Sequence, residues 1–434
     1  MKLIVILSAF LIGITNDSYA FKGDLTQLVK RPGKNELYVC GEFKTVFVLD
    51  AKTGETIRTF SVDEAGITSL QFTPDGSILL AANYNTVHLL DPNTGSKLKS
   101  IKGANFILSQ AGKYIINMDR WGKKVQLLNS SDGTIINTIA CDFEPVYASL
   151  SPESDKLYIM GNAQEIKNEK SLLTQEVKAV AGYNTYNKAF MDQQADKKGA
   201  AFLEVDVNSF KAKPVVMIPY TPGMSTFGKL ISAYNTNIYI MSFEMFIKVD
   251  KSGKAYPMET DLSNFAYAAE NTSTGRYIVN ASGLKGFIYD CETNKYASYN
   301  AADFMSSVYA MDICTSNDTI YLLGSDYTIL TMDTKGNVYK KFRLSNPGEG
   351  IKFGTYYTNG YTTKELRDKE ALIVNTLLKE KSLPEIDLET SLSNGDKEPL
   401  IGAFSTYEEA SDFVKELKER KLNYVVKIYP VSVK

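Results

Sequence analysis

The sequence predicts a mainly β protein, in which a seven-bladed β-propeller is followed by a small α+β domain of ferredoxin-like order (βαββαβ). Three observations predict this architecture. A phrase of an apolar residue, then Asp or Asn, then a polar turn recurs seven times. A run of Tyr, Ile, Val or Leu precedes each recurrence, and the pattern changes to alternating strands and helices after Leu344. A repeat of about 40 residues is typical of a four-stranded blade, and such blades stack around an axis to bury their faces.

The N-terminal segment has the composition of a secretory signal peptide. Lys2 is followed by an apolar run from Leu3 to Ile14, and the segment closes with the small residues of Ser18–Ala20. A membrane-spanning helix needs roughly 20 apolar residues, so this run is short for an anchor, although an uncleaved anchor is the alternative. We therefore expect a signal peptide over residues 1–20 and an exported protein, periplasmic or secreted, with no transmembrane segment in the mature chain.

The composition excludes some partners. The 434 residues carry 48 basic and 50 acidic side chains, which are interspersed, so neither nucleic acid nor anionic membrane is an expected partner. Cysteines stand at four distant positions without the spacing of a metal site. They are either buried free thiols or disulfide partners in any of three pairings. These positions are Cys40, Cys141, Cys291 and Cys314.

The Asp or Asn of the recurring phrase is predicted to hold a turn between the third and fourth strands of each blade. Its side-chain oxygen can accept hydrogen bonds from the turn backbone, and a following Gly supplies positive φ. Because the residue recurs in every blade, we expect a structural role for it rather than a catalytic one. The seven positions are Asp50, Asp91, Asn129, Asp206, Asp250, Asp290 and Asp333.

The second strand of each blade, in chain order, is predicted to be apolar on both faces and therefore buried between neighbouring blades. Blade two shows the whole pattern, with strands at Ile67–Phe72, Ser77–Asn83, Thr86–Leu90 and Lys97–Ile101. The second strands of the seven blades include Leu37–Cys40, Ile78–Ala81, Tyr114–Asn117, Leu157–Met160, Ile238–Met241, Tyr277–Asn280 and Ile320–Leu323.

These repeats resemble the YVTN and WD-type β-propeller families over residues 23–350. The Tyr- and Val/Ile-rich second strand and the Asp-x-x-x-Gly turn carry the resemblance, whereas the Trp-Asp dipeptide of the stricter WD family is absent. We expect the propeller to occupy residues 21–346.

The interval between Asn129 and Asp206 is nearly twice as long as the others. Its middle part has a helical pattern, with apolar residues such as Leu172 and Val177 among Lys, Glu and Gln. We therefore expect an insertion over residues 164–199 inside blade four rather than an eighth blade. Such an insertion is either a binding segment or a simple surface excursion.

The C-terminal part is predicted to alternate strands and helices after a linker at Ser345–Gly348. Two capping boxes begin the helices, Thr362 with Glu365 and Ser405 with Glu408. The second helix has an apolar stripe at i, i+3, i+4 and i+7, made by Ala410, Phe413, Val414 and Leu417. The predicted elements are strand Ile351–Tyr357, helix Thr362–Lys381, strands Glu385–Leu392 and Leu400–Phe404, a helix from Ser405, and strand Tyr424–Tyr429.

This domain, residues 349–434, resembles a SPOR domain, the peptidoglycan-binding module of bacterial envelope proteins. The residues Ile351–Tyr356 fit the first half-repeat of that family, and Ile401–Phe404 with the Glu408–Ala410 helix start fits the second. The chain departs from the family at Lys352, where Gln is common, at Leu400, where a polar residue is usual, and in its longer first helix.

The resemblance implies that glycan strands lie on the sheet face that the helices leave uncovered. Strand alternation turns Ile351, Phe353 and Thr355 toward the helices. The opposite face then offers tyrosine rings for stacking on sugars and lysine donors for their oxygens. Strand Tyr424–Tyr429 contributes either Lys427 and Tyr429 or their neighbours to this face. The predicted glycan-binding residues are Lys352, Gly354, Tyr356, Lys427 and Tyr429. A ferredoxin-like module for protein contacts is the alternative.

No catalytic residue or cofactor is predicted. The only histidine, His88, lies in a predicted strand, and the sequence contains no P-loop, dinucleotide or nucleophile-elbow motif in a suitable context. Three functions stay open. The first is a cell-envelope protein that binds peptidoglycan and presents its propeller to an unknown envelope protein. The second is a secreted propeller that mediates protein contacts only, and the third is a propeller enzyme of the lyase or dehydrogenase type.

Overall fold

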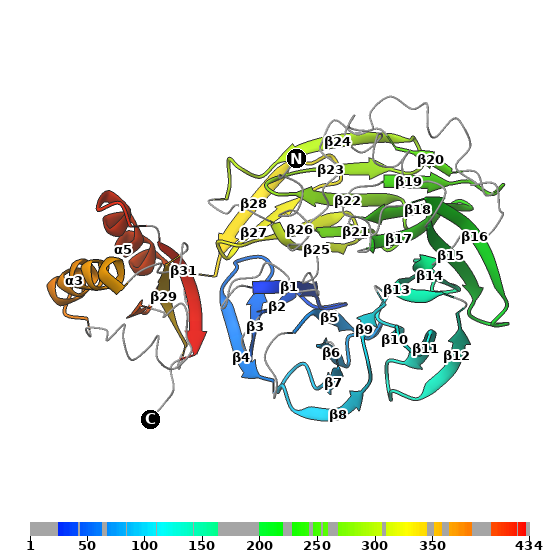
Figure 1. Ribbon diagram of the computed structural model, residues 1–434, viewed down its shortest axis with the longest axis horizontal. Helices are drawn as coiled ribbons and strands as arrows, with labels where there is room; N and C mark the ends of the chain where they lie inside the picture. The colour runs from blue at the N-terminus through cyan, green and yellow to red at the C-terminus, as the bar shows by residue number, and fades with distance from the viewer. Residues whose placement is uncertain are drawn as a thin grey trace, which may run out of the picture.

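The structure is a computed structural model (Figure 1). It describes residues 25–430 except 42–43, 63–66, 84, 110, 142, 164–198, 220–227, 243–245, 253–254, 259–267, 306–309, 345–350, 358–363, 384–400 and 423. The expected signal peptide, residues 1–20, lies outside the described residues. Within those residues, no helix is both long and apolar enough to cross a bilayer.

Seven four-stranded antiparallel sheets follow one another along the described chain and form a ring (Figure 1). The strand order of each sheet is the chain order, with the first strand innermost. This confirms the seven-bladed propeller and the mainly β class.

Blade one consists of β1 (Leu25–Lys30), β2 (Glu36–Gly41), β3 (Thr45–Asp50) and β4 (Thr56–Ser61), and blade two of β5 (Ser69–Phe72), β6 (Leu79–Ala82), β7 (Thr86–Leu90) and β8 (Lys97–Lys102). Blade three consists of β9 (Phe106–Leu108), β10 (Tyr114–Asp119), β11 (Lys124–Asn129) and β12 (Ile135–Ala140). Blade four consists of β13 (Glu144–Leu150), β14 (Lys156–Ala163), β15 (Gly199–Asp206) and β16 (Ala212–Pro219). The last three are made of β17 (Gly228–Tyr234), β18 (Asn237–Ser242), β19 (Phe246–Val249) and β20 (Ala255–Pro257); β21 (Ala268–Asn271), β22 (Tyr277–Ser282), β23 (Lys285–Asp290) and β24 (Lys295–Asn300); and β25 (Ala310–Ser316), β26 (Thr319–Gly324), β27 (Thr328–Met332) and β28 (Val338–Arg343).

The middle strands of a blade form its core. In blade one, β2 is buried from Leu37 onward and β3 is buried up to Leu49, whereas β4 alternates partly buried and exposed residues. The apolar runs of the sequence are therefore strands packed on both faces, and the outermost strand is half solvated.

The turn after the third strand is held as the sequence predicts. Asp50 Oδ1 accepts hydrogen bonds from Lys52 N and Thr53 N at 2.7 and 2.8 Å. These bonds, from Thr53 first, lower the pKa of the Asp50 carboxyl. The side chains of the other six positions accept the same bond from the N–H two residues on: Asp91, Asn129, Asp206, Asp250, Asp290 and Asp333.

The glycine of this turn packs against the outer strand of the preceding blade. A Cβ on Gly95, whose φ is +73°, would lie 2.3 Å from the ring of Phe60 in blade one. A Cβ on Gly54, whose φ is +79°, would lie 2.4 Å from Phe342 in blade seven. The joint between blades seven and one thus repeats the contact between blades one and two.

The ring closes without strand exchange, because β1–β4 and β25–β28 form separate sheets. Side chains of β25 instead bind the backbone of β1. Asp312 Oδ2 accepts from Leu28 N at 2.7 Å, and Cys314 Sγ accepts from Lys30 N at 3.3 Å. We refer to this contact as the closing joint.

The expected insertion falls between the second and third strands of blade four. β14 and β15 are paired in one ladder, with Ala163 opposite Gly199. The boundary differs by one residue from the predicted range 164–199, because Gly199 belongs to β15; residues 164–198 lie outside the described residues.

The C-terminal part contains β29 (Ile351–Tyr357), α3 (Lys364–Glu380), β30 (Ile401–Phe404), α5 (Tyr407–Glu419) and β31 (Tyr424–Pro430). Its sheet is antiparallel, with the order β30-β29-β31. The predicted strand Glu385–Leu392 and the capping residue Thr362 lie outside the described residues. The described part of this domain therefore has two helices and three strands.

Candidate functional site

The C-terminal sheet brings the five sequence-predicted glycan residues to one face. In the ladder between β29 and β31, Lys352 is opposite Tyr429 and Gly354 is opposite Lys427. Tyr356 lies two residues beyond Gly354 on the same strand. Because paired residues share a face and successive residues alternate between faces, the register places all five positions on the same face.

The opposite face of this sheet is the one that packs against α5. Thr355 is fully buried and Tyr424 is 1% exposed, and both lie at register positions of that face. The rings of Phe404 on β30 and Phe413 on α5 lie 5.2 Å apart. The apolar stripe predicted for the second helix is buried here, together with Tyr407.

Helix α5 begins one residue later than the sequence predicts. The N-cap is Thr406, whose hydroxyl accepts from Glu409 N at 3.2 Å. The Glu409 carboxylate in turn accepts from Thr406 N and also from Ser405 N. The predicted pair of Ser405 with Glu408 is therefore wrong, because Thr406 with Glu409 satisfies three N–H groups and allows Tyr407 to pack inward.

The N-terminal end of α5 packs against blade seven. The Tyr407 ring meets the ring of Tyr327, which is fully buried in the β26–β27 turn, with centroids 5.9 Å apart. The Arg343 guanidinium lies 4.4 Å from the centre of the Tyr407 ring and pairs with Asp326 at 3.0 Å. Burial raises the pKa of Tyr407 to about 12, against the opposing effect of Arg343. One apolar cluster thus runs from the propeller into the C-terminal domain.

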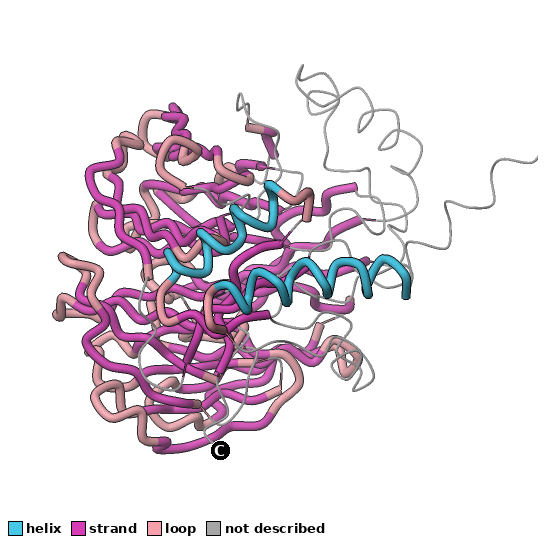
Figure 2. Tube along the Cα trace, turned by 90° about the vertical axis from the view of Figure 1, so that its left-hand side faces the viewer, coloured by secondary structure: helices cyan, strands magenta, loops and turns pink. Residues whose placement is uncertain are grey.

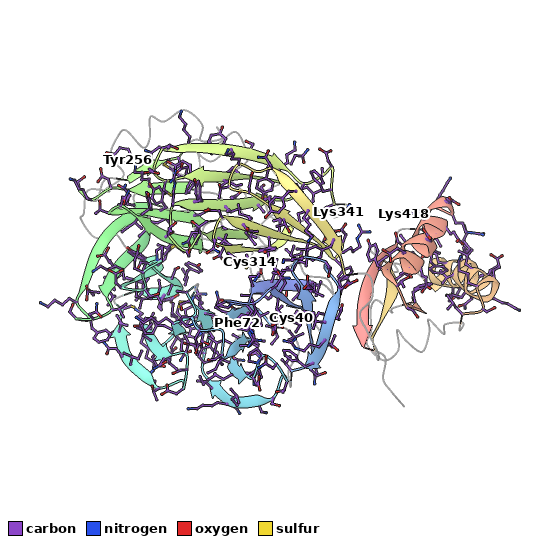
Figure 3. The ribbon with its side chains drawn as sticks, turned by 180° about the vertical axis from the view of Figure 1, so that it is seen from behind. Cys40, Phe72, Tyr256, Cys314, Lys341 and Lys418 are labelled. Carbon is purple, nitrogen blue, oxygen red and sulfur yellow. The ribbon has the colours of Figure 1, made fainter. Side chains whose placement is uncertain are left out.

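The helices of the C-terminal domain lie on its outer side. Figure 1 shows β29 and β31 nearer to the propeller than α3 and α5, and Figure 2 shows the two helices in front of the strands from the side of this domain. Figure 3 gives the same arrangement from behind and labels Lys418 on α5.

A groove of about 510 Å³ lies on the propeller rim next to this domain. Among the described residues it is lined by Thr53–Thr59 of blade one and Phe342–Leu344 of blade seven. It therefore lies between the outer strands of blades one and seven, β4 and β28, where the chain leaves the propeller.

The centre of the propeller holds a cavity of about 630 Å³. It is lined by residues from the first strand of every blade, which makes it the axial channel (Figure 1). Its charged residues among those described are Lys30, Glu270 and Asp312. The channel wall therefore mixes polar and apolar side chains, and its described residues include two acids and one base.

Two carboxylates of the channel lie on neighbouring inner strands, Glu270 on β21 and Asp312 on β25. Burial, and then the nearby Asp312, raise the pKa of Glu270 well above its ordinary value. Burial, and then Glu270, also raise the pKa of Tyr147 on β13. Glu270 therefore binds its proton more tightly than an exposed glutamate does.

The described residues offer no further catalytic constellation. They contain no group of three or more His, Cys, Asp or Glu side chains that could hold a metal ion. All four cysteines are buried free thiols, and burial raises the pKa of Cys40, Cys291 and Cys314. A raised pKa keeps a thiol protonated and weakly nucleophilic. His88 lies in β7 as predicted, with Nδ1 2.9 Å from Ser100 Oγ.

Sequence reasoning missed the channel carboxylates. The available signal was an acid inside an otherwise apolar inner strand, Asp312 between Met311 and Ile313. Glu270 gives a weaker signal, because its strand, Ala268–Asn271, has only four residues and begins with two alanines.

Comparison with known proteins supports the fold and leaves the activity open. No protein family matches the sequence, and no curated protein matches it. Among 1766 matching chains of solved structures is one described as hydrazine synthase of Kuenenia stuttgartiensis. It is 13% identical, with a TM-score of 0.50, and the match covers 76% of this chain and 99% of that chain. At this identity the likeness shows a shared fold alone.

Proposed function

We propose that this protein is exported to the cell envelope, where its C-terminal domain binds peptidoglycan glycan strands and its propeller is a scaffold for protein contacts. The proposal gives the chain a binding role rather than a catalytic one. It includes a signal peptide over residues 1–20 and propeller repeats related to the YVTN and WD type.

The register between β29 and β31 carries the proposal. It gathers two lysines, two tyrosines and a glycine on the sheet face opposite α5. A glycine between them allows a sugar ring to approach the backbone closely, and tyrosine faces stack on such rings. Lysine donates hydrogen bonds to hydroxyl and acetamide oxygens.

The proposed SPOR-like fold needs a fourth strand beside β30. The order β30-β29-β31 and the antiparallel ladders are those expected for three strands of a βαββαβ sheet. The sequence predicts this fourth strand at Glu385–Leu392, which lies outside the described residues.

Binding to purified sacculi by the full-length chain tests the function. Tyr356→Ala and Lys427→Ala should each weaken binding about tenfold, equivalent to about 1.4 kcal/mol. Matched controls are Tyr339→Ala, on β28 and 60% exposed, and Lys418→Ala, exposed in the last turn of α5; both should bind like the unchanged chain.

Point variants are better suited to this test than deletion of residues 349–434. Deletion would uncover Tyr327 and part of the shared apolar cluster, so loss of binding would be mixed with loss of stability. Equal binding by all four variants would reject glycan binding by this face. The alternative, a C-terminal domain that mediates protein contacts, would then be favoured.

A further inference from the structure

The outer strands of blades seven, one, two and three share one irregularity. In each of these blades, the pairing of the third strand with the fourth skips one residue of the outer strand, which forms a β-bulge there. In blade two, Leu90 is opposite Lys97 and Leu89 is opposite Lys99, so that Leu98 has no opposite residue. Blade four has the same shift, whereas the ladders of β19 with β20 and of β23 with β24 have none. The skipped residues of the first four blades named are Tyr339, Ile57, Leu98 and Ile136.

These four skipped residues are all apolar and all exposed. Ile57 is 48% exposed, Leu98 58%, Ile136 42% and Tyr339 60%. A bulge on an outer strand protects the edge of a sheet from pairing with another chain, but a polar residue at the bulge would protect it equally well. A single exposed apolar side chain needs no explanation, whereas its recurrence at one position of four neighbouring blades does. Contact with a partner supplies the reason.

The four bulges follow one another along the perimeter of the propeller. Figure 1 shows β28, β4, β8 and β12 as the outermost strands of neighbouring blades. We refer to these four strands as the rim arc. Ile57 also lines the groove of about 510 Å³ between β4 and β28. The rim arc therefore combines protruding apolar side chains with one hollow that can receive side chains of a partner.

The charged residues of the rim arc are all basic. Its four strands contain no Asp or Glu, although the whole chain has slightly more acids than bases. Two of the bases are paired within their own blades, Arg58 with Glu36 and Arg343 with Asp326. A surface that carries acids beside apolar side chains would complement this arc. The remaining bases are Lys97, Lys99, Lys102, Lys340 and Lys341.

We propose that the rim arc is the docking surface of the propeller for an acidic partner protein, which contacts the four bulged side chains and the lysines beside them. This inference rests on the proposed scaffold function and adds the chemistry of the partner. Because a bulge interrupts the ladder of each outer strand, the partner binds side chains and does not add a strand to the sheet. The arc follows a convex perimeter, so a flat membrane would meet only part of it.

Binding of two synthetic amphipathic peptides to the full-length chain tests the docking surface. One peptide has a helical stripe of Leu with Glu on its remaining faces, and the other has Lys in place of every Glu. In fluorescence anisotropy, the Glu peptide should bind at least about tenfold more tightly than the Lys peptide, and added salt should weaken its binding. No binding of the Glu peptide, or equal affinity for the two peptides, would overturn the proposal.

Two exposed residues of β8 locate the binding. Leu98→Ser and Lys102→Glu should each weaken binding of the Glu peptide about tenfold, and their exposure leaves the core of the blade unchanged. The same substitutions outside the rim arc are the controls: Leu372→Ser, 72% exposed on α3, and Lys418→Glu, exposed on α5, should keep the affinity. Equal losses in variants and controls, or full affinity in Leu98→Ser, would contradict docking at the rim arc.

Vesicles test the membrane alternative. Phosphatidylglycerol vesicles should bind the chain no better than neutral phosphatidylcholine vesicles do. Stronger binding to phosphatidylglycerol that is lost in Leu98→Ser would assign the rim arc to a lipid surface and overturn the protein partner. Peptide binding is measured without sacculi, and sacculus binding without peptide, so the docking surface and the glycan face can each fail alone.

Discussion

At the scale of single residues, the turn aspartates carry the most regular chemistry of the chain. Each binds a backbone N–H two residues away, so the contact is fixed by local sequence alone. This locality is why the sequence predicts the role of Asp50, Asp290 and their equivalents correctly in all seven blades.

Asp290 adds a second contact to the turn. Its carboxylate accepts from Arg276 Nε and Nη2 at 3.1 and 3.0 Å, besides the N–H of Glu292. Burial alone would raise the pKa of Asp290, but these donors outweigh burial and lower it.

Replacing Asp290 by Ala should therefore lower the free energy of unfolding by about 1–2 kcal/mol at neutral pH. The lowered pKa means that the contribution is present above the unfolded pKa of about 4 and is lost as pH falls through the folded pKa. Urea unfolding at neutral and acidic pH measures it. A deficit of Asp290→Ala that stays constant into acid would contradict the charged contact.

Glu270 and Asp312 are the opposite case. They lie on different blades, so no local pattern relates them, and their neighbourhood exists only once β21 and β25 are side by side. An acid in an apolar strand marks a buried charge but not its partner. The sequence could therefore not predict this part of the channel.

At the scale of elements, the start of α5 shows that a capping motif alone does not determine the residue at which a helix begins. Ser405 with Glu408 and Thr406 with Glu409 fit the same capping motif, one residue apart. The choice is made by packing, because the register with Thr406 as N-cap buries Tyr407 along with Phe413.

This assignment predicts different costs for two neighbouring hydroxyls. Thr406→Ala should lower the free energy of unfolding by about 1 kcal/mol, because it removes the acceptor of Glu409 N. Ser405→Ala should cost less than Thr406→Ala, because it keeps the backbone N–H that Ser405 donates to the Glu409 carboxylate. Thermal unfolding of both variants decides the register of the cap, and equal costs would contradict it.

The candidate glycan face was also predictable at this scale, but only in part. Alternation along β29 separates Lys352, Gly354 and Tyr356 from the helix side. The choice between Lys427 and its neighbours needs the register of β31, a contact between segments about seventy residues apart, which the ladder supplies.

At the scale of the whole molecule, repetition explains why the propeller was predictable. Seven similar sequence repeats indicate one architecture, and the joint between blades seven and one repeats the joint between blades one and two, as Gly54 and Gly95 show. The position of the C-terminal domain is different, because the contact of Tyr407 with Tyr327 and Arg343 joins it to blade seven, and nothing in the sequence pattern marks Tyr327 as the partner of Tyr407.

Tyr407→Ala should release the C-terminal domain from blade seven. Truncating a buried aromatic side chain costs about 3 kcal/mol, and here the loss falls on the contact with Tyr327 and Arg343. Limited proteolysis should cut the segment 345–350 faster in this variant than in the unchanged chain. The exposed Tyr339→Ala is the control, and equal cleavage rates for the two variants would contradict a contact through Tyr407.

The absence of strand exchange between the first and last blades also bears on how the nascent polypeptide matures. Each blade is one contiguous stretch, so it can complete its own hydrogen-bond ladder as soon as its residues emerge, without waiting for a strand from the far terminus. The contacts between blades one and seven, such as the meeting of β1 with β25, span nearly the entire propeller, and contacts of such long sequence separation form slowly. The rate-limiting event in assembly is therefore expected to be the last docking step, after every individual sheet is already built.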